Sequence, residues 1–286
     1  MAHPIGKKHP FKSLVRFITW QLQSMLMPSK LFVKHFIYPV KFYARKKLTG
    51  ITGNIYTGLH EFDDMGFLLH FLRPGDIFYD IGANVGSYTL LASGVCKAKS
   101  VTIEPVKAAF DILTKNIGLN HLQNEVQLLH SGAGSYNGSA IFSSNEDTTN
   151  HVIPNNDTID GETTLTSIIK IDEVFEKSSP ALIKIDVEGY ETEVLKGMTE
   201  TLKQPNLKAI IIELNGSGIR YGYDEKDIHQ LLLRNGFTPH SYDPFSRKLA
   251  AMQSFGSHNT IYCRDIDFIT ERLINAKSIK VMGEII

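Results

Sequence analysis

One short segment limits the possible folds of this chain more than any other: an apolar run that ends in an acid and a glycine-containing turn. Residues 75–86 read Gly-Asp-Ile-Phe-Tyr-Asp-Ile-Gly-Ala-Asn-Val-Gly, and a helical pattern follows over residues 85–94. A strand, a tight turn and a helix N-terminus therefore meet at Gly82, as they do beside the nucleotide-binding crevices of α/β sheets. A second apolar run, residues 101–103, ends at Glu104. That is where such folds present a carboxylate to the two ribose hydroxyls of a nucleotide.

The turn differs from the fingerprint of dinucleotide-binding proteins. That fingerprint needs glycine at its third position so that the backbone can approach a pyrophosphate, and here Asn84 occupies the position. A pyrophosphate ligand is therefore disfavoured. S-adenosylmethionine carries a ribose and an adenine without phosphate, and its amino-acid end needs carboxylates, carbonyls and amide donors. Asp80, the turn at Gly82 and Asn84 supply that mixture, although the same turn also fits an ordinary connection between a strand and a helix.

Length and composition are those of an ordinary globular chain. The 286 residues, 42% of them hydrophobic, are sufficient for a substantial core. We find no apolar run long enough to span a bilayer and no signal-peptide pattern in residues 1–27, so a cytoplasmic protein is expected. Cys96 and Cys263 show no metal-ligand spacing and are expected to be buried thiols.

The formal net charge of zero conceals an uneven distribution. Residues 1–60 contain ten Lys or Arg and no acid, so the rest of the chain holds 20 basic and 30 acidic residues. A basic segment with interleaved aromatic residues can lie peripherally on an anionic membrane surface, bind nucleic acid, or pack as a helical cap on the acidic remainder. We therefore expect a basic, aromatic-rich N-terminal extension over residues 1–55, with two or three helices or turns, and a second domain over residues 56–286.

The second domain alternates predicted strands with helix-length segments. Strands are predicted at residues 77–81, 100–104, 126–129, 181–187 and 209–213, with helices between them. Such alternation indicates a parallel sheet with right-handed crossovers. Residues 238–242 and 260–264 predict a closing antiparallel pair. The polar, asparagine-rich residues 143–161 predict a long surface loop.

Charged side chains gather at the ends of two of these strands. Lys184, Asp186 and Glu188 share one strand face by the period-two rule, and Glu213 and Asn215 close the neighbouring strand. Because unpaired charge is costly in a central strand, these groups should be paired or lie at the open rim of the sheet. One interpretation is a substrate-binding rim. Two others are a structural ion pair of Lys184 with one of the acids, and a Mg²⁺ site formed by Asp186, Glu188 and Glu213.

These motifs together resemble the FkbM family of S-adenosylmethionine-dependent methyltransferases. The resemblance covers about residues 58–215 and rests on the Asp-Ile-Gly-Ala-Asn-Val-Gly motif at 80–86, Glu104-Pro105, the glycine-rich loop 132–138, Ile-Asp-Glu-Val at 171–174, Lys-Ile-Asp-Val-Glu-Gly at 184–189 with Glu191, and Ile-Ile-Glu at 211–213. It implies a class I, Rossmann-like α/β fold with a seven-stranded, mostly parallel sheet and one antiparallel strand. It also implies O-methylation of a hydroxyl on a sugar, glycan or small natural product.

The expected site follows from the motifs and the resemblance. Residues expected to bind the cofactor S-adenosyl-L-methionine are Glu61, Asp80, Gly82, Ala83, Asn84, Gly86, Glu104, Pro105 and Ser135. Ser135 stands where family members commonly carry an acid, and Asn215 stands where a histidine is frequent. Asp186 or Glu188 is expected to orient or deprotonate the acceptor hydroxyl. No metal ligand is assigned.

Three other classes of function compete with this interpretation. A nicotinamide-dependent oxidoreductase fits the crevice, but Asn84 argues against it. A nucleic-acid methyltransferase would use the basic N-terminus, yet residues 186–189 lack the Pro-Pro-aromatic sequence of amine-directed enzymes. A non-catalytic module docked on a membrane through residues 1–50 would bind no cofactor. The expected partner is a small-molecule or glycan acceptor.

Overall fold

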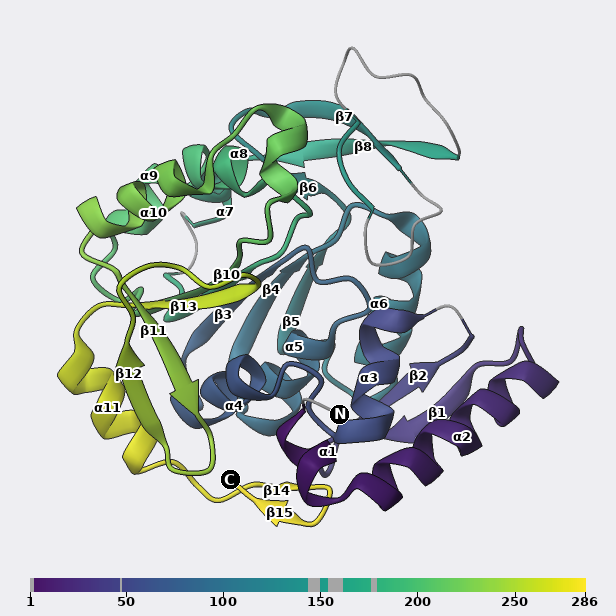
Figure 1. Cartoon of the computed structure of the whole chain (residues 1–286). Coiled ribbons are helices and arrows are strands. Elements are labelled where there is room, and N and C mark those ends of the chain that lie inside the picture. The colour runs from purple at the N-terminus through teal and green to yellow at the C-terminus, as the bar shows by residue number, and fades with distance from the viewer. Residues whose placement is uncertain (1–2, 47, 144–149, 154–161, 176–178) are drawn as a thin grey trace.

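The computed structural model of the chain describes residues 3–46, 48–143, 150–153, 162–175 and 179–286. A twisted eight-stranded sheet runs through its centre, in the order β12-β11-β13-β10-β9-β3-β4-β5, and helices cover both faces (Figure 1). Most of the surface loop predicted at residues 143–161 lies outside the described residues.

The parallel part of the sheet is built from the strands that the sequence predicts. Its members are β3 (Ile77–Ile81), β4 (Lys99–Ile103), β5 (Val126–Leu129), β9 (Leu182–Ile185) and β10 (Ala209–Glu213). All four neighbouring pairs among them are parallel. Strands buried on both faces are rich in β-branched and other apolar residues, as these are.

The other end of the sheet contains the reversed strand. β13 (Asn259–Cys263) runs antiparallel to both of its neighbours, β10 and β11 (Thr238–Asp243). The predicted closing pair and the seven strands with one reversed strand are therefore confirmed. An eighth strand, β12 (Lys248–Ala251), was not predicted, and it pairs with β11 as a hairpin at the sheet edge.

Helices pack on both faces because successive strand residues point to opposite sides. One face is covered by α4 (Phe62–Phe71), α5 (Ser87–Thr89), the π-helical η1 (Leu90–Val95), α6 (Lys107–Leu119) and α11 (Ile266–Ile274). The other face is covered by α7 (Ile171–Phe175), α8 (Glu191–Lys196), α9 (Thr199–Lys203) and α10 (Glu225–Arg234). Along β10, for example, Ile211 faces the first set and Ile210 faces the second.

One predicted helix is broken in two. The sequence predicts a single helix over residues 191–202, but the structure has α8 and α9 with Gly197 between them. A Cβ atom at Gly197 would lie 1.9 Å from the carbonyl oxygen of Gly134, so this close approach requires glycine. Contact with the loop at Gly134 thus accompanies the break, which helical periodicity alone does not reveal.

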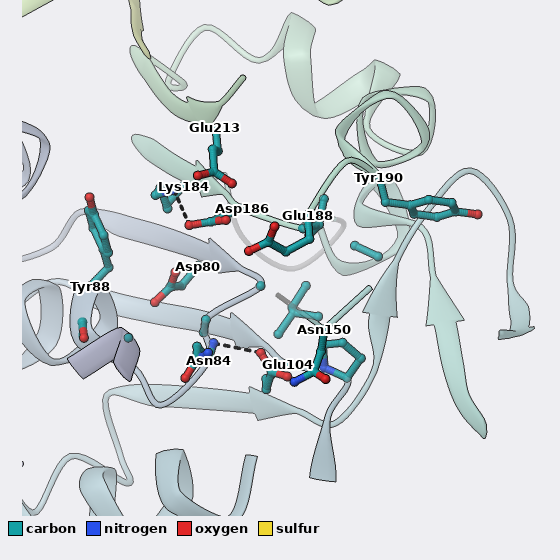
Figure 2. Close-up of a pocket in the computed structure, with 18 of the residues that line it drawn as sticks. Asp80, Asn84, Tyr88, Glu104, Asn150, Lys184, Asp186, Glu188, Tyr190 and Glu213 are labelled. Atoms are coloured by element: carbon teal, nitrogen blue, oxygen red, sulfur yellow. Dashed lines mark hydrogen bonds and ion pairs between the residues drawn. The ribbon is translucent and has the colours of Figure 1, made fainter. Parts of the chain in front are cut away.

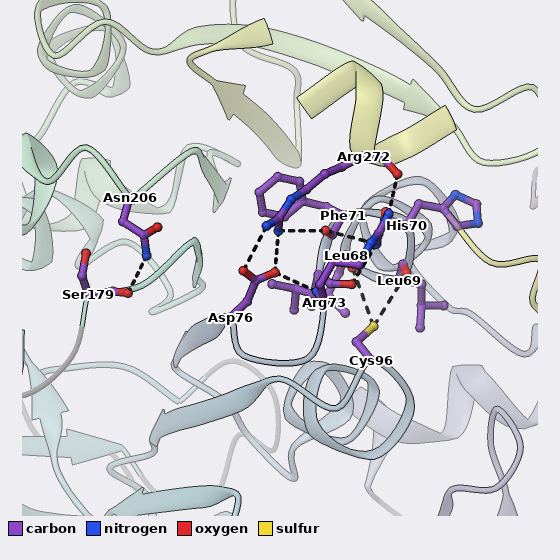
Figure 3. Close-up of polar contacts among 11 residues, drawn as sticks. Leu68, Leu69, His70, Phe71, Arg73, Asp76, Cys96, Ser179, Asn206 and Arg272 are labelled. Carbon is purple, nitrogen blue, oxygen red and sulfur yellow. Dashed lines mark hydrogen bonds and ion pairs between the residues drawn. The ribbon is translucent and has the colours of Figure 1, made fainter. Parts of the chain in front are cut away.

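Asp76 ties two helices to the start of β3, at the end of the sheet opposite the carboxyl ends of the parallel strands. Arg272 of α11 donates to the Asp76 carboxylate, which also accepts the backbone N–H of Arg73 at 2.7 Å (Figure 3). The Arg73 guanidinium donates in turn to the carbonyl oxygen of His70, 2.8 Å away at the end of α4. This network fixes where β3 enters the sheet.

Smaller elements surround this framework. A three-stranded sheet contains β6 (Gly132–Ala133), β7 (Gly138–Ser143) and β8 (Thr163–Ile169), and a two-stranded sheet contains β14 (Lys280–Val281) and β15 (Glu284–Ile285). The 3₁₀ helix η2 (Ser217–Tyr221) follows β10. The three-stranded sheet lies at the top of Figure 1, beyond the carboxyl ends of the parallel strands.

The N-terminal segment is more structured than the sequence predicts. It forms α1 (Pro4–Lys8), α2 (Pro10–Leu26), the hairpin β1 (Phe32–His35) and β2 (Lys41–Ala44), and α3 (Thr49–Thr57). The helices are consistent with the expected two or three pieces, whereas the hairpin was not predicted. Its buried Phe32 and Phe42 belong to the same apolar cluster as Phe67 of α4. Within the described residues, none of the helices has the length and apolar character needed to cross a bilayer.

Candidate active site

A cavity of about 650 Å³ opens at the carboxyl ends of the parallel strands. This volume lies within the usual range for small-molecule sites. The predicted site residues that line it are Glu61, Asp80, Gly82, Ala83, Asn84, Glu104, Pro105, Asp186 and Glu188. The structure therefore brings predicted residues from four separate segments to one cavity.

Two residues that the sequence predicts to bind the cofactor, Gly86 and Ser135, are not among the residues that line the cavity. Gly86 precedes α5 and faces α6, since a Cβ atom there would lie 2.5 Å from Cδ1 of Leu113. The Ser135 hydroxyl instead donates to the carboxylate of Glu193 on α8. In this part of the cavity the wall includes Gly132 and Ala133, which belong to the glycine-rich loop 132–138 but were not among the expected site residues.

Gly82 brings the turn after β3 against the end of β9. Its φ angle of +80° lies in the left-handed region, and a Cβ atom there would stand 1.8 Å from the carbonyl oxygen of Asp186. The N–H groups of Gly82 and Ala83 both donate to the carbonyl oxygen of Ile103 at 3.0 Å. The predicted cofactor turn and the predicted catalytic segment therefore touch through backbone atoms.

Glu104 is a buried carboxyl held in place by two backbone groups. Its Oε2 accepts the N–H of Asn84 at 2.8 Å (Figure 2), and its Oε1 accepts the N–H of Val106 at 2.7 Å. Burial raises the pKa of Glu104 to about 7, although these two hydrogen bonds lower it. Each carboxylate oxygen has a second lone pair, so Glu104 retains the capacity to accept two hydroxyl groups.

Asp80 serves the local structure as well as the cavity. Its Oδ2 accepts both the N–H and the hydroxyl of Thr89, at 3.0 and 2.6 Å, which anchors the first turn after the glycine loop. Burial raises the pKa of Asp80 to about 6. Thr89 was not predicted as a site residue, because a threonine in an apolar helix carries no distinctive sequence signal.

The charged groups in and just after the carboxyl ends of β9 and β10 form one cluster (Figure 2). The Lys184 ammonium lies 2.9 Å from Oδ2 of Asp186, so the predicted ion pair is present. Lys184 itself is only 1% exposed. Burial alone would lower the pKa of Lys184, but the carboxylates of Asp186 and Glu61 raise it above its usual value, and the lysine stays charged.

Glu188 and Glu213 complete the cluster. One oxygen from each of Asp186, Glu188 and Glu213 lies within 4.8 Å of the others. Burial, followed by the charges of Asp186 and Glu191, raises the pKa of Glu188 to about 7. Burial and the neighbouring Asp186 raise the pKa of Glu213 far above its usual range. Of these groups Glu188 has a pKa near neutrality, which suits a general base.

The same three carboxyls were considered as a magnesium site in the sequence. Their convergence is compatible with a hard cation that prefers oxygen ligands. One oxygen of Asp186 is already engaged by Lys184, which compensates part of the cluster's negative charge without a metal. A metal site therefore stays an untested alternative.

Asn259 is a site residue that sequence reasoning missed. Its Nδ2 donates to Oε1 of Glu61 at 2.6 Å, and its Oδ1 accepts from the Lys184 ammonium at 3.0 Å. Glu61 is thereby linked through Asn259 and Lys184 to Asp186. Asn259 lies beside the charged cluster because β13 pairs with β10, which sets Asn259 opposite Glu213. No local sequence motif indicates this position.

Known proteins support the same assignment. The family model described as "Methyltransferase FkbM domain" matches residues 80–239. The hexuronic acid methyltransferase AglP of Haloferax volcanii is 32% identical over 176 residues, which cover 60% of this chain and 67% of that protein.

Solved structures give weaker matches. A precorrin-6y C5,15-methyltransferase from Geobacter metallireducens superposes with a TM-score of 0.40 and 12% identity, covering 70% of this chain and 85% of that one. M. capricolum TrmK, in complex with S-adenosyl-homocysteine, gives a TM-score of 0.39 and 10% identity, covering 71% of this chain and 68% of that one. TM-scores this low do not support an argument about function.

The strand order, the reversed strand beside β10 and the cavity at the carboxyl edge are those of a class I, Rossmann-like methyltransferase. The chain belongs to the FkbM methyltransferase family, whose model matches more than half of it.

Proposed function

We propose that this methyltransferase uses S-adenosyl-L-methionine to O-methylate a hydroxyl of a sugar, glycan or small natural product. The main observation behind the proposal is that one cavity has two walls with different chemistry. The carboxyl of Glu104, held by backbone N–H groups, lies on one side, and the cluster of the Asp186, Glu188 and Glu213 carboxyls lies on the other. The family match supports methyl transfer, and the sugar-modifying relative supports a sugar-containing acceptor.

The residues on the first wall fit the cofactor. Each carboxylate oxygen of Glu104 accepts one backbone N–H and has a second lone pair, which would accept a ribose hydroxyl. Asp80, the turn at Gly82 and Asn84 would hold the amino-acid end, with Glu61, Ala83 and Pro105 beside them. When bound, the cofactor supplies an electrophilic methyl group on a sulfonium.

The residues on the second wall fit an alcohol acceptor. Glu188 or Asp186 would accept the hydroxyl proton as the acceptor oxygen bonds to the methyl carbon and the carbon–sulfur bond breaks, and Lys184 would hold the Asp186 carboxylate in place. Alignment of the reacting groups supplies much of the rate enhancement in such a displacement.

The charged groups that line the cavity restrict the kinds of acceptor it can bind. Its described wall holds the carboxyls of Glu61, Asp80, Glu104, Asp186, Glu188 and Glu213, together with the paired Lys184. Because like charges in a desolvated site repel each other, we propose that the acceptor presents a neutral hydroxyl to the cluster, with any carboxylate directed elsewhere. The nucleic-acid and nicotinamide alternatives are not favoured, since the relative acts on a sugar acid.

We retain the division of the chain into residues 1–55 and 56–286 as part of this proposal, with the methyltransferase domain in the second part. The family match lies entirely within that part.

The function is tested by incubating the protein and S-adenosyl-L-methionine with neutral and acidic sugars and their glycans, and by following the gain of one methyl group by mass spectrometry. Methylation of a hydroxyl that requires Glu188 supports the proposal. Methyl transfer to a carboxyl, a nitrogen or a nucleobase would contradict it.

A further inference from the structure

The outer face of α2 carries a continuous apolar strip. Its members are exposed and follow the spacing of one helix face: Phe11, Leu14, Val15, Ile18, Leu22, Met25 and Leu26. Their exposed fractions run from 44% at Leu14 to 80% at Leu26. We call this set the α2 strip. Figure 1 shows α2 at the periphery of the molecule, away from the central sheet.

The polarity of α2 is the reverse of that of an ordinary surface helix. Its buried residues are Ser13, Trp20 and Ser24, and the helix packs on α3. Trp20 meets Phe32 edge-on, with 5.9 Å between ring centroids. An ordinary surface helix buries its apolar stripe and exposes its polar side. Because an exposed apolar patch of this extent marks an interaction site, the α2 strip requires a partner.

Cations flank the α2 strip. Lys12 and Arg16 lie on the helix itself, and the Lys34 ammonium of β1 donates to Oε1 of Gln23 at 2.6 Å, beside the helix. Arg16 also reaches the carbonyl oxygen of Tyr56. No Asp or Glu occurs in residues 1–60, so nothing in this part of the sequence opposes the positive charge.

We propose that the α2 strip docks the protein, with α2 parallel to the surface, on a lipid bilayer that carries anionic headgroups. The apolar side chains would enter the boundary between headgroups and acyl chains, and the flanking cations would contact the headgroups. The helix does not qualify as a membrane-spanning segment, which agrees with an in-plane orientation. This inference does not depend on the acceptor or on the catalytic assignment.

A second copy of this chain is the other apolar partner to weigh. A symmetric dimer through α2 would bring the strips together, but it would also bring together the cations of both copies. Residues 1–60 contain no acid to pair with them, so like charges would face each other across the interface. An anionic bilayer supplies the negative charge that this region lacks.

The test is flotation of the full chain with phosphatidylcholine vesicles, with and without phosphatidylglycerol, at low and high salt. We expect binding to the anionic vesicles that weakens with salt. The double variant Ile18→Glu, Leu22→Glu should reduce the bound fraction at least about tenfold. Lys12→Gln should weaken the partition about fivefold, as one cation is removed.

A matched control separates the α2 strip from general surface hydrophobicity. Leu165 of β8 and Ile274 of α11 are also exposed apolar residues, so Leu165→Glu with Ile274→Glu makes the same chemical change elsewhere and should leave flotation unchanged. Circular dichroism checks that both double variants fold.

Two results would overturn the proposal. One is an absence of flotation with anionic vesicles, or equal flotation of the α2 variant and the unmodified protein. The other is a dimer, found by light scattering, that the α2 variant abolishes while vesicle binding is absent. That second result would assign the strip to another copy of the chain.

Discussion

Two regions of this protein reverse the usual placement of side chains, and they do so in opposite directions. On α2 large apolar side chains face solvent, whereas in the cavity the carboxyl of Glu104 is buried, that of Glu188 is half-buried, and burial raises the pKa of both. Ordinary surfaces and interiors show the opposite arrangement. Each reversal opposes folding by itself. We infer that each region binds a partner that offsets this cost. The partner is a cationic ligand in the cavity and a lipid surface at α2.

The largest expected effect is a loss of catalytic rate when a carboxyl of the cavity is replaced. Glu188→Gln removes a proton acceptor but preserves shape, so kcat should fall about 10²- to 10⁴-fold while affinity for S-adenosyl-L-methionine changes little. Methyl-transfer assays and calorimetry measure the two quantities. Glu200→Gln, at an exposed position on α9, is the matched control. Full activity in both Asp186→Asn and Glu188→Gln would refute the base assignment.

The second effect concerns the cofactor wall. Glu104→Ala should weaken binding of S-adenosyl-L-methionine about a hundredfold, because it removes two acceptor sites of a charged group. Calorimetry measures this directly. Glu125→Ala, an exposed glutamate at the opposite end of the sheet, should bind normally. An unchanged affinity in Glu104→Ala would show that the ribose is bound elsewhere.

The third effect concerns the link between the two walls. Asn259→Ala leaves the buried Lys184 without one partner and Glu61 without its donor, so the free energy of unfolding should fall by about 1–3 kcal/mol. Urea unfolding measures the change, and Asn124→Ala at an exposed turn is the control. A stability equal to that of the unmodified protein would mean that water replaces the asparagine at no cost.

The fourth effect is the pH dependence of the ligand-free protein. The folded pKa of Glu104 is about 7, above its usual value, so the folded state binds this proton more tightly than the unfolded state does. Its contribution to stability is present at low pH and is lost as the pH rises through 7, by about 1 kcal/mol between pH 6 and 8. Thermal melts of the protein and of Glu104→Gln should diverge in that window. Parallel pH profiles would contradict the raised pKa.

The smallest effect is expected on the α2 side. Ile18→Glu with Leu22→Glu should change the free energy of unfolding by less than about 0.5 kcal/mol, because both side chains are exposed on the helix surface. Trp20→Ala, on the buried side of the same helix, should cost about 3–5 kcal/mol. Chemical denaturation compares the two. A large loss in the double variant would show that the strip stabilises the fold itself.

Much of the sheet could be predicted because its strands are local apolar runs with turn residues at their ends. The five parallel strands and the closing antiparallel pair are confirmed. Two of the unpredicted features, β12 and the β1–β2 hairpin, are short strands with mixed burial, and such strands carry weak alternation. Their pairing depends on partners that the local sequence does not identify.

The sequence by itself determined the strand, turn and helix at Gly82, the carboxyl at Glu104 and the charged strand end at Lys184 and Asp186, because glycine geometry and strand periodicity act over a few residues. Only the tertiary structure decided that Asn259 meets Glu61 and that Ser135 turns to Glu193. It also decided that the apolar side of α2 faces outward, while Ser13, Trp20 and Ser24 are the buried residues of the helix. Contacts between segments far apart in the sequence depend on how the whole chain packs, and a local sequence pattern does not contain that information.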